Sequence, residues 1–225
     1  MLPSAESHHA SRVLRLAPGQ NITLLDGKGT RAIAEITSTQ GKEVEISVLE
    51  LQTFPKQQAQ IELFLAPPKS NDRLDFILEK STELGIAAIH FIHCRNSERK
   101  NVRMDKLEQK VIAACKQSLN PWFPVLNDFQ PLANLNPNLF KNSCFFHCRE
   151  DIQRKSLTEI SIPQHVCLFI GPEGDFSQDE IELALRCGAQ SCSLGDLRLR
   201  TETAVLSAIV QLQTLYKLGQ SFTKI

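Results

Sequence analysis

The sequence predicts an α/β protein in which a small all-β domain precedes a larger domain of alternating strands and helices. Short segments with alternating apolar and polar residues, separated by polar turns, occupy residues 1–58. From residue 59 to residue 225, apolar strands alternate with segments of helical periodicity. Two of the later strands each run into a glycine-containing turn that a helix follows. We therefore predict two domains, 1–58 and 59–225.

The first domain contains four segments that favour strands, at 12–16, 21–25, 31–36 and 44–49. Pro18-Gly19 provides a turn after the first segment. Asp26-Gly27 follows the second, and an Asp-Gly pair between alternating segments is a strong hairpin signal. Short strands at close spacing with polar turns are typical of a small β-barrel.

The second domain begins with a strand–helix–strand unit. Residues 61–66 form an apolar strand that Pro67-Pro68 ends. Asn71 or Asp72 then caps a helix that Gly85 closes, and a second apolar strand follows over 86–93. Such a unit is expected to be parallel and right-handed.

The remaining segments continue this alternation. A helix is expected around 105–118, and strands are expected near 144–148 and over 165–170. Ser177 and Glu180 form a capping-box pattern at the start of a helix that Gly188 ends. The last helix is predicted over about 202–218.

Composition excludes several classes of protein. The chain has 225 residues, with 25 Lys+Arg and 25 Asp+Glu. Because the charges balance, the overall composition gives no indication of a nucleic-acid partner. The basic stretch at 95–106 is consistent with either a solvated loop or a phosphate-binding loop. No apolar run approaches the roughly 18–20 residues of a membrane span, and the N-terminus lacks a signal-peptide pattern. We therefore expect a cytoplasmic protein that binds no membrane.

Cysteine usage argues against disulfides and metal. Seven cysteines, an odd and scattered set, do not form a disulfide framework. Cys144, His147 and Cys148 lie in or beside a short apolar strand, and no second ligand pair follows them. Because free cysteine commonly behaves as a small buried apolar residue, we expect no metal site.

The two glycine turns are the candidate functional site. One is Gly171-Pro172-Glu173-Gly174, and the other is Leu194-Gly195, which precedes Arg200-Thr201-Glu202-Thr203 at a helix start. Turns at the carboxyl ends of neighbouring strands face one crevice, where open α/β sheets bind ligands. Neither turn matches a dinucleotide or phosphate-binding pattern. Each one alone is also consistent with a connecting turn or an ordinary helix cap.

Together the two segments resemble the RsmE family of ribosomal RNA methyltransferases, in the SPOUT (α/β-knot) superfamily. The matching patterns are F-I-G-P-E-G-x-F-S-x-x-E and L-G-x-x-x-L-R-T-E-T-A. Weaker matches are spread over almost the whole chain, at 6–9, 13–16, Lys69, 72–73, 79–80, 82–85, 97–99 and 116–118. The resemblance implies a C-terminal trefoil-knotted SPOUT methyltransferase domain and an N-terminal PUA-like β-barrel that binds RNA.

The resemblance also implies an activity: methyl transfer from S-adenosylmethionine (SAM) to N3 of one uridine near the 3′ end of 16S ribosomal RNA. The enzyme would act as a homodimer on RNA of the small ribosomal subunit. SAM would lie in the knot against the loops that contain Phe169, Ile170, Gly171, Pro172, Glu173, Gly174, Leu194, Gly195, Leu199, Arg200, Thr201, Thr203 and Ala204.

Arg200 and Glu202 are the candidate catalytic residues. Attack by uracil N3 requires that its proton be lost or held by a base, so Glu202 is a candidate base or orienting group, and Glu173 is a less favoured one. Arg200 would stabilise charge on a uracil oxygen or bind a phosphate. The candidate RNA-binding residues are Arg12, Arg15, Lys69, Arg73, Arg99 and Lys100.

Three features depart from the family pattern. Asp175 stands where glycine is common, and Asn120 stands where arginine is common. The match begins close to Glu6, so either a shortened first barrel strand or a truncated start is expected. Two alternatives remain open: another SPOUT methyltransferase with a different target such as tRNA, and a non-catalytic RNA-binding assembly protein.

Overall fold

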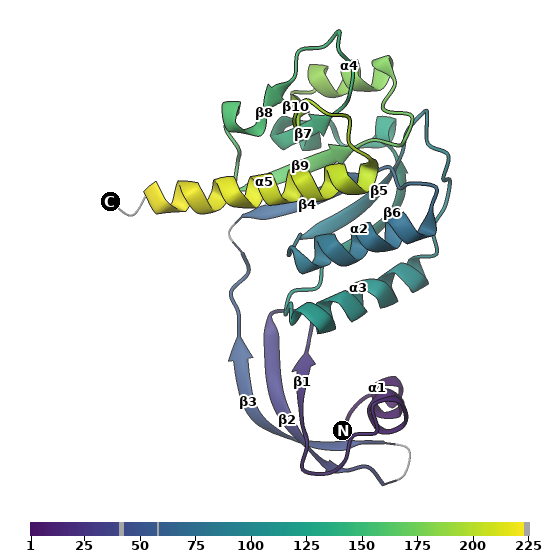
Figure 1. Ribbon diagram of the computed structural model, residues 1–225, viewed down its shortest axis with the longest axis vertical. Coiled ribbons are helices and arrows are strands. Elements are labelled where there is room, and N and C mark those ends of the chain that lie inside the picture. The colour runs from purple at the N-terminus through teal and green to yellow at the C-terminus, as the bar shows by residue number, and fades with distance from the viewer. Residues whose placement is uncertain (41–42, 58, 223–225) are drawn as a thin grey trace. The chain divides into compact units, whose positions relative to one another are not determined.

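The computed structural model describes residues 1–40, 43–57 and 59–222. For residues 219–222 it describes the backbone but not the side chains. Contacts divide the chain into two compact units (Figure 1). The first unit consists of Met1–Lys56 and Leu119–Trp122, and the second consists of Gln57–Ser118 and Phe123–Ile225. Residue 58, the last residue of the predicted first domain, lies outside the described residues.

The first unit contains a three-stranded antiparallel sheet in the order β1-β2-β3. Its strands are β1 (Asn21–Leu25), β2 (Thr30–Ser38) and β3 (Glu45–Thr53). The predicted Asp26-Gly27 hairpin joins β1 to β2, and Gly27 has a φ of +72°. The Asp26 carboxylate accepts hydrogen bonds from the backbone N–H groups of Thr30 (2.8 Å) and Lys28 (2.7 Å), and these bonds lower the pKa of Asp26. The turn therefore fixes the register of the two strands.

The strand predicted over 12–16 is wrong. Helix α1 (Ser4–His8) and a π-helical turn (His9–Val13) occupy the region before residue 14. The buried Ser7 hydroxyl donates to the Leu2 carbonyl (3.0 Å) and accepts from the Val44 N–H (3.1 Å), which ties the helix to the chain before β3. Leu2 and Ala10 are buried with Ile36 and Val44 in a small apolar cluster. Tertiary burial of this helix outweighs the local alternation that suggested a strand.

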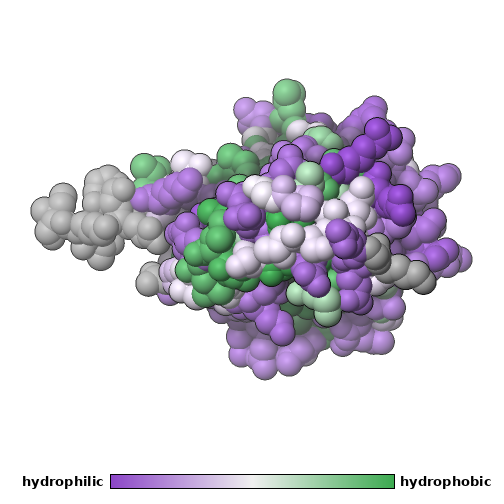
Figure 2. Space-filling model, turned by 90° about the horizontal axis from the view of Figure 1, so that it is seen from below, coloured by the Kyte–Doolittle hydropathy of each residue, from purple (hydrophilic) through white to green (hydrophobic). Residues whose placement is uncertain are grey.

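Two further features of the first unit concern its surface. Asn120 accepts a hydrogen bond from the Trp122 N–H through its side-chain oxygen (3.0 Å), so part of its role is local turn formation. Val48, Leu49 and Leu51 on β3 each expose more than half of their surface. Figure 2 views the molecule from below and shows hydrophobic residues, coloured green, gathered among a largely hydrophilic surface.

The second unit is built on a seven-stranded sheet in which all recorded pairings are parallel, in the order β6-β5-β4-β9-β7-β10-β8. Its strands are β4 (Gln60–Leu65), β5 (Ala88–His93), β6 (Val125–Pro131), β7 (Ser143–Phe146), β8 (Lys155–Ser156), β9 (His165–Ile170) and β10 (Gln190–Ser193). Its helices are α2 (Asn71–Glu83), α3 (Met104–Ser118), α4 (Gln178–Arg186) and α5 (Thr201–Phe222), with short 3-10 turns at Leu132–Asn134, Pro137–Asn142 and Leu157–Glu159. Alternating strands and helices give the parallel α/β class that the sequence predicts.

Some boundaries differ from the predictions. Ser70, rather than Asn71 or Asp72, caps α2 by accepting a hydrogen bond from the Arg73 N–H (3.4 Å). The sequence reading also missed β6, an edge strand with mostly exposed or half-buried residues and therefore a weak apolar signal. Helix α5 continues through Gly219 to Phe222, because glycine weakens a helix without necessarily ending it.

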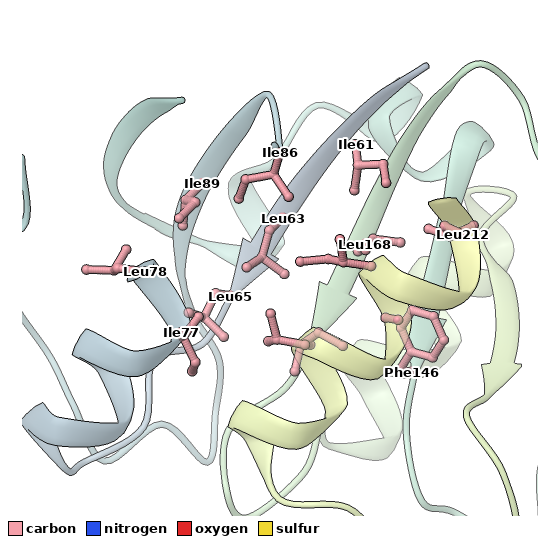
Figure 3. Close-up of a cluster of buried hydrophobic side chains, with 14 of the residues drawn as sticks. Ile61, Leu63, Leu65, Ile77, Leu78, Ile86, Ile89, Phe146, Leu168 and Leu212 are labelled. Carbon is pink, nitrogen blue, oxygen red and sulfur yellow. The ribbon is translucent and has the colours of Figure 1, made fainter. Parts of the chain in front are cut away.

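The two faces of the sheet carry separate cores. Val166, Leu168 and Ile170 on β9 pack on the face that α2, α3 and α5 cover. Figure 3 shows side chains of β4 and β9, including Leu63 and Leu168, directed toward α2 and α5. Cys167 and Phe169 point to the opposite face and join the cluster that includes Ile181 and Ala184 of α4. Successive strand residues point to opposite faces, so β9 is buried on both sides.

Helix α5 brings the C-terminal part of the chain against elements that come earlier in the sequence. It starts after the β10 loop and packs against α2 and β9 (Figure 1). Within the described residues, no helix has both the length and the apolar character that a membrane span requires.

Candidate functional site

The carboxyl ends of β7, β9 and β10 surround a cavity of about 460 Å³. The loop after β9 contributes 171–173 and Asp175, and the loop after β10 contributes 194–195 and 197–200. The chain after β7 contributes His147 and Cys148. These strands are neighbours in the sheet although they are distant in sequence, so the parallel topology brings the three loops together.

The loop after β9 is closely packed at Gly171. A Cβ atom built there would lie 2.9 Å from the ring of Phe176, which is itself buried. Further along, Ser177 and Glu180 form the predicted capping box at the start of α4. Close packing at Gly171 and the cap at Ser177 therefore restrain the two ends of the loop, and the main chain of Gly171 borders the cavity.

Asp175, one of the departures from the family pattern, connects two of the cavity loops. Its backbone has a φ of +60°, a left-handed conformation that glycine adopts without strain. Its carboxylate accepts hydrogen bonds from the N–H groups of Cys148 and Phe176, both at 2.8 Å. The Asn96 side chain donates to the Asp175 carbonyl at 3.0 Å. The aspartate side chain therefore holds the β7 loop beside the β9 loop.

We expect Asp175→Ala to destabilise the protein more than Asp175→Gly does. Both variants lose the two carboxylate hydrogen bonds, but only alanine keeps the strain of a positive φ, which costs ~1–2 kcal/mol. Urea unfolding of the two variants measures the difference. A glycine variant that is no more stable than the alanine variant would show that the backbone at this position relaxes freely.

The loop after β10 has a backbone conformation suited to glycine. Gly195 has a φ of +135°, and a Cβ atom built there would meet nothing within 4 Å. The Ser193 hydroxyl donates to the Gly195 carbonyl at 2.9 Å. The Gln211 amide on α5 donates to the Leu194 carbonyl at 3.5 Å, so the helix holds the loop. Main-chain groups of this loop therefore border the cavity in a fixed arrangement.

The guanidinium group of Arg73 forms ion pairs with two carboxylates beside the cavity. Arg73 on α2 lies 2.6 Å from a Glu173 carboxylate oxygen and 3.6 Å from a Glu202 carboxylate oxygen. The second Glu202 oxygen, Oε2, is buried and has no hydrogen-bond partner among the described residues. Arg73 and Glu173 line the cavity, whereas Glu202 does not. Glu202 therefore does not border the cavity itself but contacts Arg73, a residue that does.

Most of the predicted cofactor residues come together at this cavity. It is lined by Ile170, Gly171, Pro172, Glu173, Leu194, Gly195, Leu199, Arg200, Thr201 and Ala204. Phe169, Gly174 and Thr203 are outside the lining. Phe169 is fully buried in the α4-side core, and Gly174 packs against Asn96.

The sequence reading missed part of the lining. The missed residues are Arg73 as a cavity residue, Phe146, His147, Cys148, Arg154, Asp175, Cys192, Ser193, Leu197 and Arg198. His147 is buried, and this burial lowers its pKa. Its Nε2 lies 2.9 Å from the Ser191 hydroxyl, and its carbonyl accepts a hydrogen bond from Arg154 at 3.0 Å. Knowledge that β7 lies between β9 and β10 would have identified Phe146, His147 and Cys148.

The six candidate RNA-binding residues have different environments. Arg12, Arg15 and Lys100 are exposed. Lys69 forms an ion pair with Glu98 at 3.0 Å. Arg99 donates to the carbonyls of Pro68 and Lys69 and to the Asn71 side chain, so it holds the loop that precedes α2.

Comparison with known proteins identifies the class. The model of the RNA methyltransferase domain family matches residues 55–213, and the model of the RNA methyltransferase PUA domain matches residues 2–49. The chain therefore belongs to the RNA methyltransferase family, with the SPOUT fold in its second unit and a PUA-like first domain.

The similar proteins narrow this class to the RsmE group. A crystal structure of ribosomal RNA small subunit methyltransferase E from Neisseria gonorrhoeae, bound to S-adenosyl methionine, is 31% identical. The match has a TM-score of 0.84 and covers 95% of this chain and 90% of that one. Proteins of the same name from Rickettsia conorii and Bacillus subtilis are each 28% identical, over 92% and 91% of this chain and 86% and 85% of their own lengths.

Proposed function

We propose that this protein transfers a methyl group from SAM to N3 of a uridine near the 3′ end of 16S ribosomal RNA. The observation that carries the proposal is the cavity at the carboxyl ends of β9 and β10, bordered by main-chain groups of two glycine turns. The similar Neisseria structure is described as bound to S-adenosyl methionine. A SAM-bound relative of the same family and a suitable cavity in this chain together support the proposal.

The residues present fit such a cofactor. A cavity of about 460 Å³ is in the range of sites for small molecules, which extends over roughly 300–1,000 Å³. Ile170, Leu194 and Leu199 provide apolar surface for a flat base. Gly171 and Gly195 leave main-chain groups accessible for hydrogen bonds. Glu173 places a carboxylate at the edge, where it suits a hydroxyl or a cationic group.

When bound, SAM supplies a methyl group on a positively charged sulfur. The protein must then orient the uracil, exclude water and manage the N3 proton. Arg200 lies at the cavity and is suited to stabilise negative charge on a uracil oxygen. Glu202 contacts Arg73 and not the cavity, so we assign it an orienting role that acts through Arg73.

Single-turnover methylation of 16S RNA tests these roles. We expect Arg200→Ala to lower the rate by ~10²–10³-fold, the usual cost of removing a group that stabilises developing charge. Glu202→Gln should lower the rate by less than tenfold if it only orients Arg73, and by ~10²–10⁴-fold if it is the base. An Arg200→Ala variant with an unchanged rate would contradict the catalytic assignment of Arg200.

Calorimetric titration with S-adenosylhomocysteine tests the broader proposal. Micromolar or tighter binding supports a functioning methyltransferase. The absence of binding would instead favour a non-catalytic RNA-binding assembly protein. Mass mapping of 16S RNA and tRNA from cells that lack the protein would identify the methylated nucleotide, and a missing tRNA methyl group would contradict the proposed target.

We further propose that residues 1–58 and the basic stretch at 95–106 bind the RNA backbone around an unpaired target base. Side chains cannot read the deep major groove of an A-form helix, so the base must be presented outside a duplex. The exposed Arg12, Arg15 and Lys100 are available for phosphate contacts. We also propose that the enzyme is a homodimer that acts in the cytoplasm, where ribosomal subunits are assembled, and that its chemistry needs no metal.

Charge reversal at Lys100 is expected to weaken RNA binding and leave SAM affinity unchanged. Lys100 is exposed, and loss of one phosphate contact reduces the salt dependence of binding by about one unit of slope. Filter binding at several salt concentrations measures this effect for Lys100→Glu. Arg99→Glu is the contrasting variant, because loss of its bonds to the 68–71 loop should also disturb the cavity beside Arg73. Equal loss of RNA and SAM affinity at Lys100 would contradict the assignment.

A further inference from the structure

A second group of polar side chains lies at the other end of the sheet from the cavity. Glu62 on β4, His90 on β5, and His165 and Cys167 on β9 occupy the amino-terminal parts of three adjacent strands. In the paired register, Glu62 is opposite Cys167, and His165 precedes Cys167 by two positions. Residues two apart on a strand point to the same face, so His165 and Cys167 are directed to one side of the sheet.

The ligand atoms of this group are close together. The ligating atoms of Glu62, His165 and Cys167 all lie within 4.8 Å of one another. Glu62 Oε1 is 2.8 Å from His165 Nε2, and Glu62 Oε2 is 2.8 Å from His90 Nε2. Imidazole, thiolate and carboxylate are the three ligand types that zinc sites in proteins use. This mixed set therefore differs from an ordinary surface cluster of acidic groups.

The surroundings hold these groups in place. The imidazole of His90 stacks on the ring of Phe64 with 4.2 Å between centroids and an angle of 2°. His90 therefore fixes the carboxylate of Glu62 from the side away from His165. Metal-binding carboxylates commonly have such an outer hydrogen-bond partner. Cys167 is 2% exposed, whereas the His165 side chain is 52% exposed, so a cation has access from solvent at the imidazole.

We propose that Glu62, His165 and Cys167 form a binding site for a Zn²⁺-like divalent cation, with His90 as the outer partner of Glu62. The cation replaces the hydrogen bond between Glu62 Oε1 and His165, and the Cys167 thiol releases its proton on binding. Water occupies the fourth position. The site joins the central strands β4 and β9 at their amino-terminal ends, away from the SAM cavity at the carboxyl ends, so it contributes stability and takes no part in methyl transfer.

Titration of the untagged full-length protein with Zn²⁺ alone, and with Co²⁺ as a spectroscopic probe, tests the proposal. The wild type is expected to bind one Zn²⁺ per chain by calorimetry. With Co²⁺ it should show the near-ultraviolet absorption of a thiolate–cobalt bond. His165→Ala should lose at least tenfold in Zn²⁺ affinity, and Cys167→Ser should lose the thiolate band. His90→Ala, as an outer partner, should lose ~10–100-fold in affinity and keep the band.

Two matched variants serve as controls. Cys187→Ser removes a half-buried cysteine outside this group, and His93→Ala removes a half-buried histidine on β5, also outside it. Both should bind Zn²⁺ like the wild type, and circular dichroism shows whether each variant is folded. The proposal is overturned if the wild type binds no stoichiometric Zn²⁺, if Co²⁺ gives no thiolate band, or if the band survives in folded Cys167→Ser. Methyltransferase activity that depended on the added cation would contradict the purely stabilising role.

Discussion

Replacing Gly195 with alanine is expected to weaken SAM binding by ~10–100-fold while leaving the protein folded. Gly195 has a φ of +135°, a region essentially restricted to glycine, and holding another residue there costs ~1–3 kcal/mol. Open space around the position means that a methyl group meets no neighbour, so the loop can relieve the strain by moving. Movement takes the main-chain groups of the β10 loop away from the cofactor. A loss of 1.4 kcal/mol in binding corresponds to about a tenfold change in affinity.

Gly19→Ala is the matched control for this prediction. Gly19 has a φ of +88° and also has nothing within 4 Å of a built Cβ, but it lies in a turn of the first unit. The two variants should lose similar stability in urea unfolding, and only Gly195→Ala should bind S-adenosylhomocysteine more weakly in calorimetry. Unchanged affinity in Gly195→Ala would show that the conformation of this loop does not determine cofactor binding.

Replacing Phe169 with alanine is expected to destabilise the protein by ~3–5 kcal/mol, the typical cost of removing a buried phenylalanine side chain. The Phe169 ring is fully buried and stacks with the rings of Phe64 (4.5 Å between centroids), Phe140 (5.0 Å) and Phe145 (5.4 Å). These rings come from β4, β7, β9 and the turn before β7. The cavity left by the truncation would therefore loosen several strands of the parallel sheet at once.

Variants at Phe169 distinguish a role in core packing from a role in cofactor contact. The sequence pattern places Phe169 among the cofactor residues, but its ring lies in the α4-side core and outside the cavity lining. Phe169→Leu keeps much of the apolar volume, so it should retain normal SAM affinity with a smaller loss of stability. Phe76→Ala, at a side chain that is 42% exposed, should change stability by less than ~1 kcal/mol. Specific loss of SAM affinity in a stable Phe169→Leu variant would show that Phe169 contributes to cofactor binding after all.

The local signals in the sequence determined much of the secondary structure and identified the two glycine loops that border the candidate cavity. The strand over 165–170 and the capping box at Ser177 are present as predicted. Both depend on interactions between near neighbours in sequence, namely an apolar run and a side chain bonded to a helix start. The two glycine turns were also recognisable from local residues. Gly195 has a positive φ that favours glycine, and Gly171 packs so closely against the Phe176 ring that a Cβ atom would clash.

Only the tertiary structure decided which residues share a site. The strand predicted over 12–16 gave way to helical structure because Leu2, Ser7 and Ala10 are buried against residues beyond position 35. His147 and Arg154 reached the cavity because β7 pairs with both β9 and β10, an order that no local pattern encodes. Glu62 and His165 are 103 positions apart and still form a hydrogen bond, because parallel pairing of β4 with β9 brings them together. Sequence periodicity reports the face on which a residue lies, whereas the order of strands in the sheet determines its neighbours.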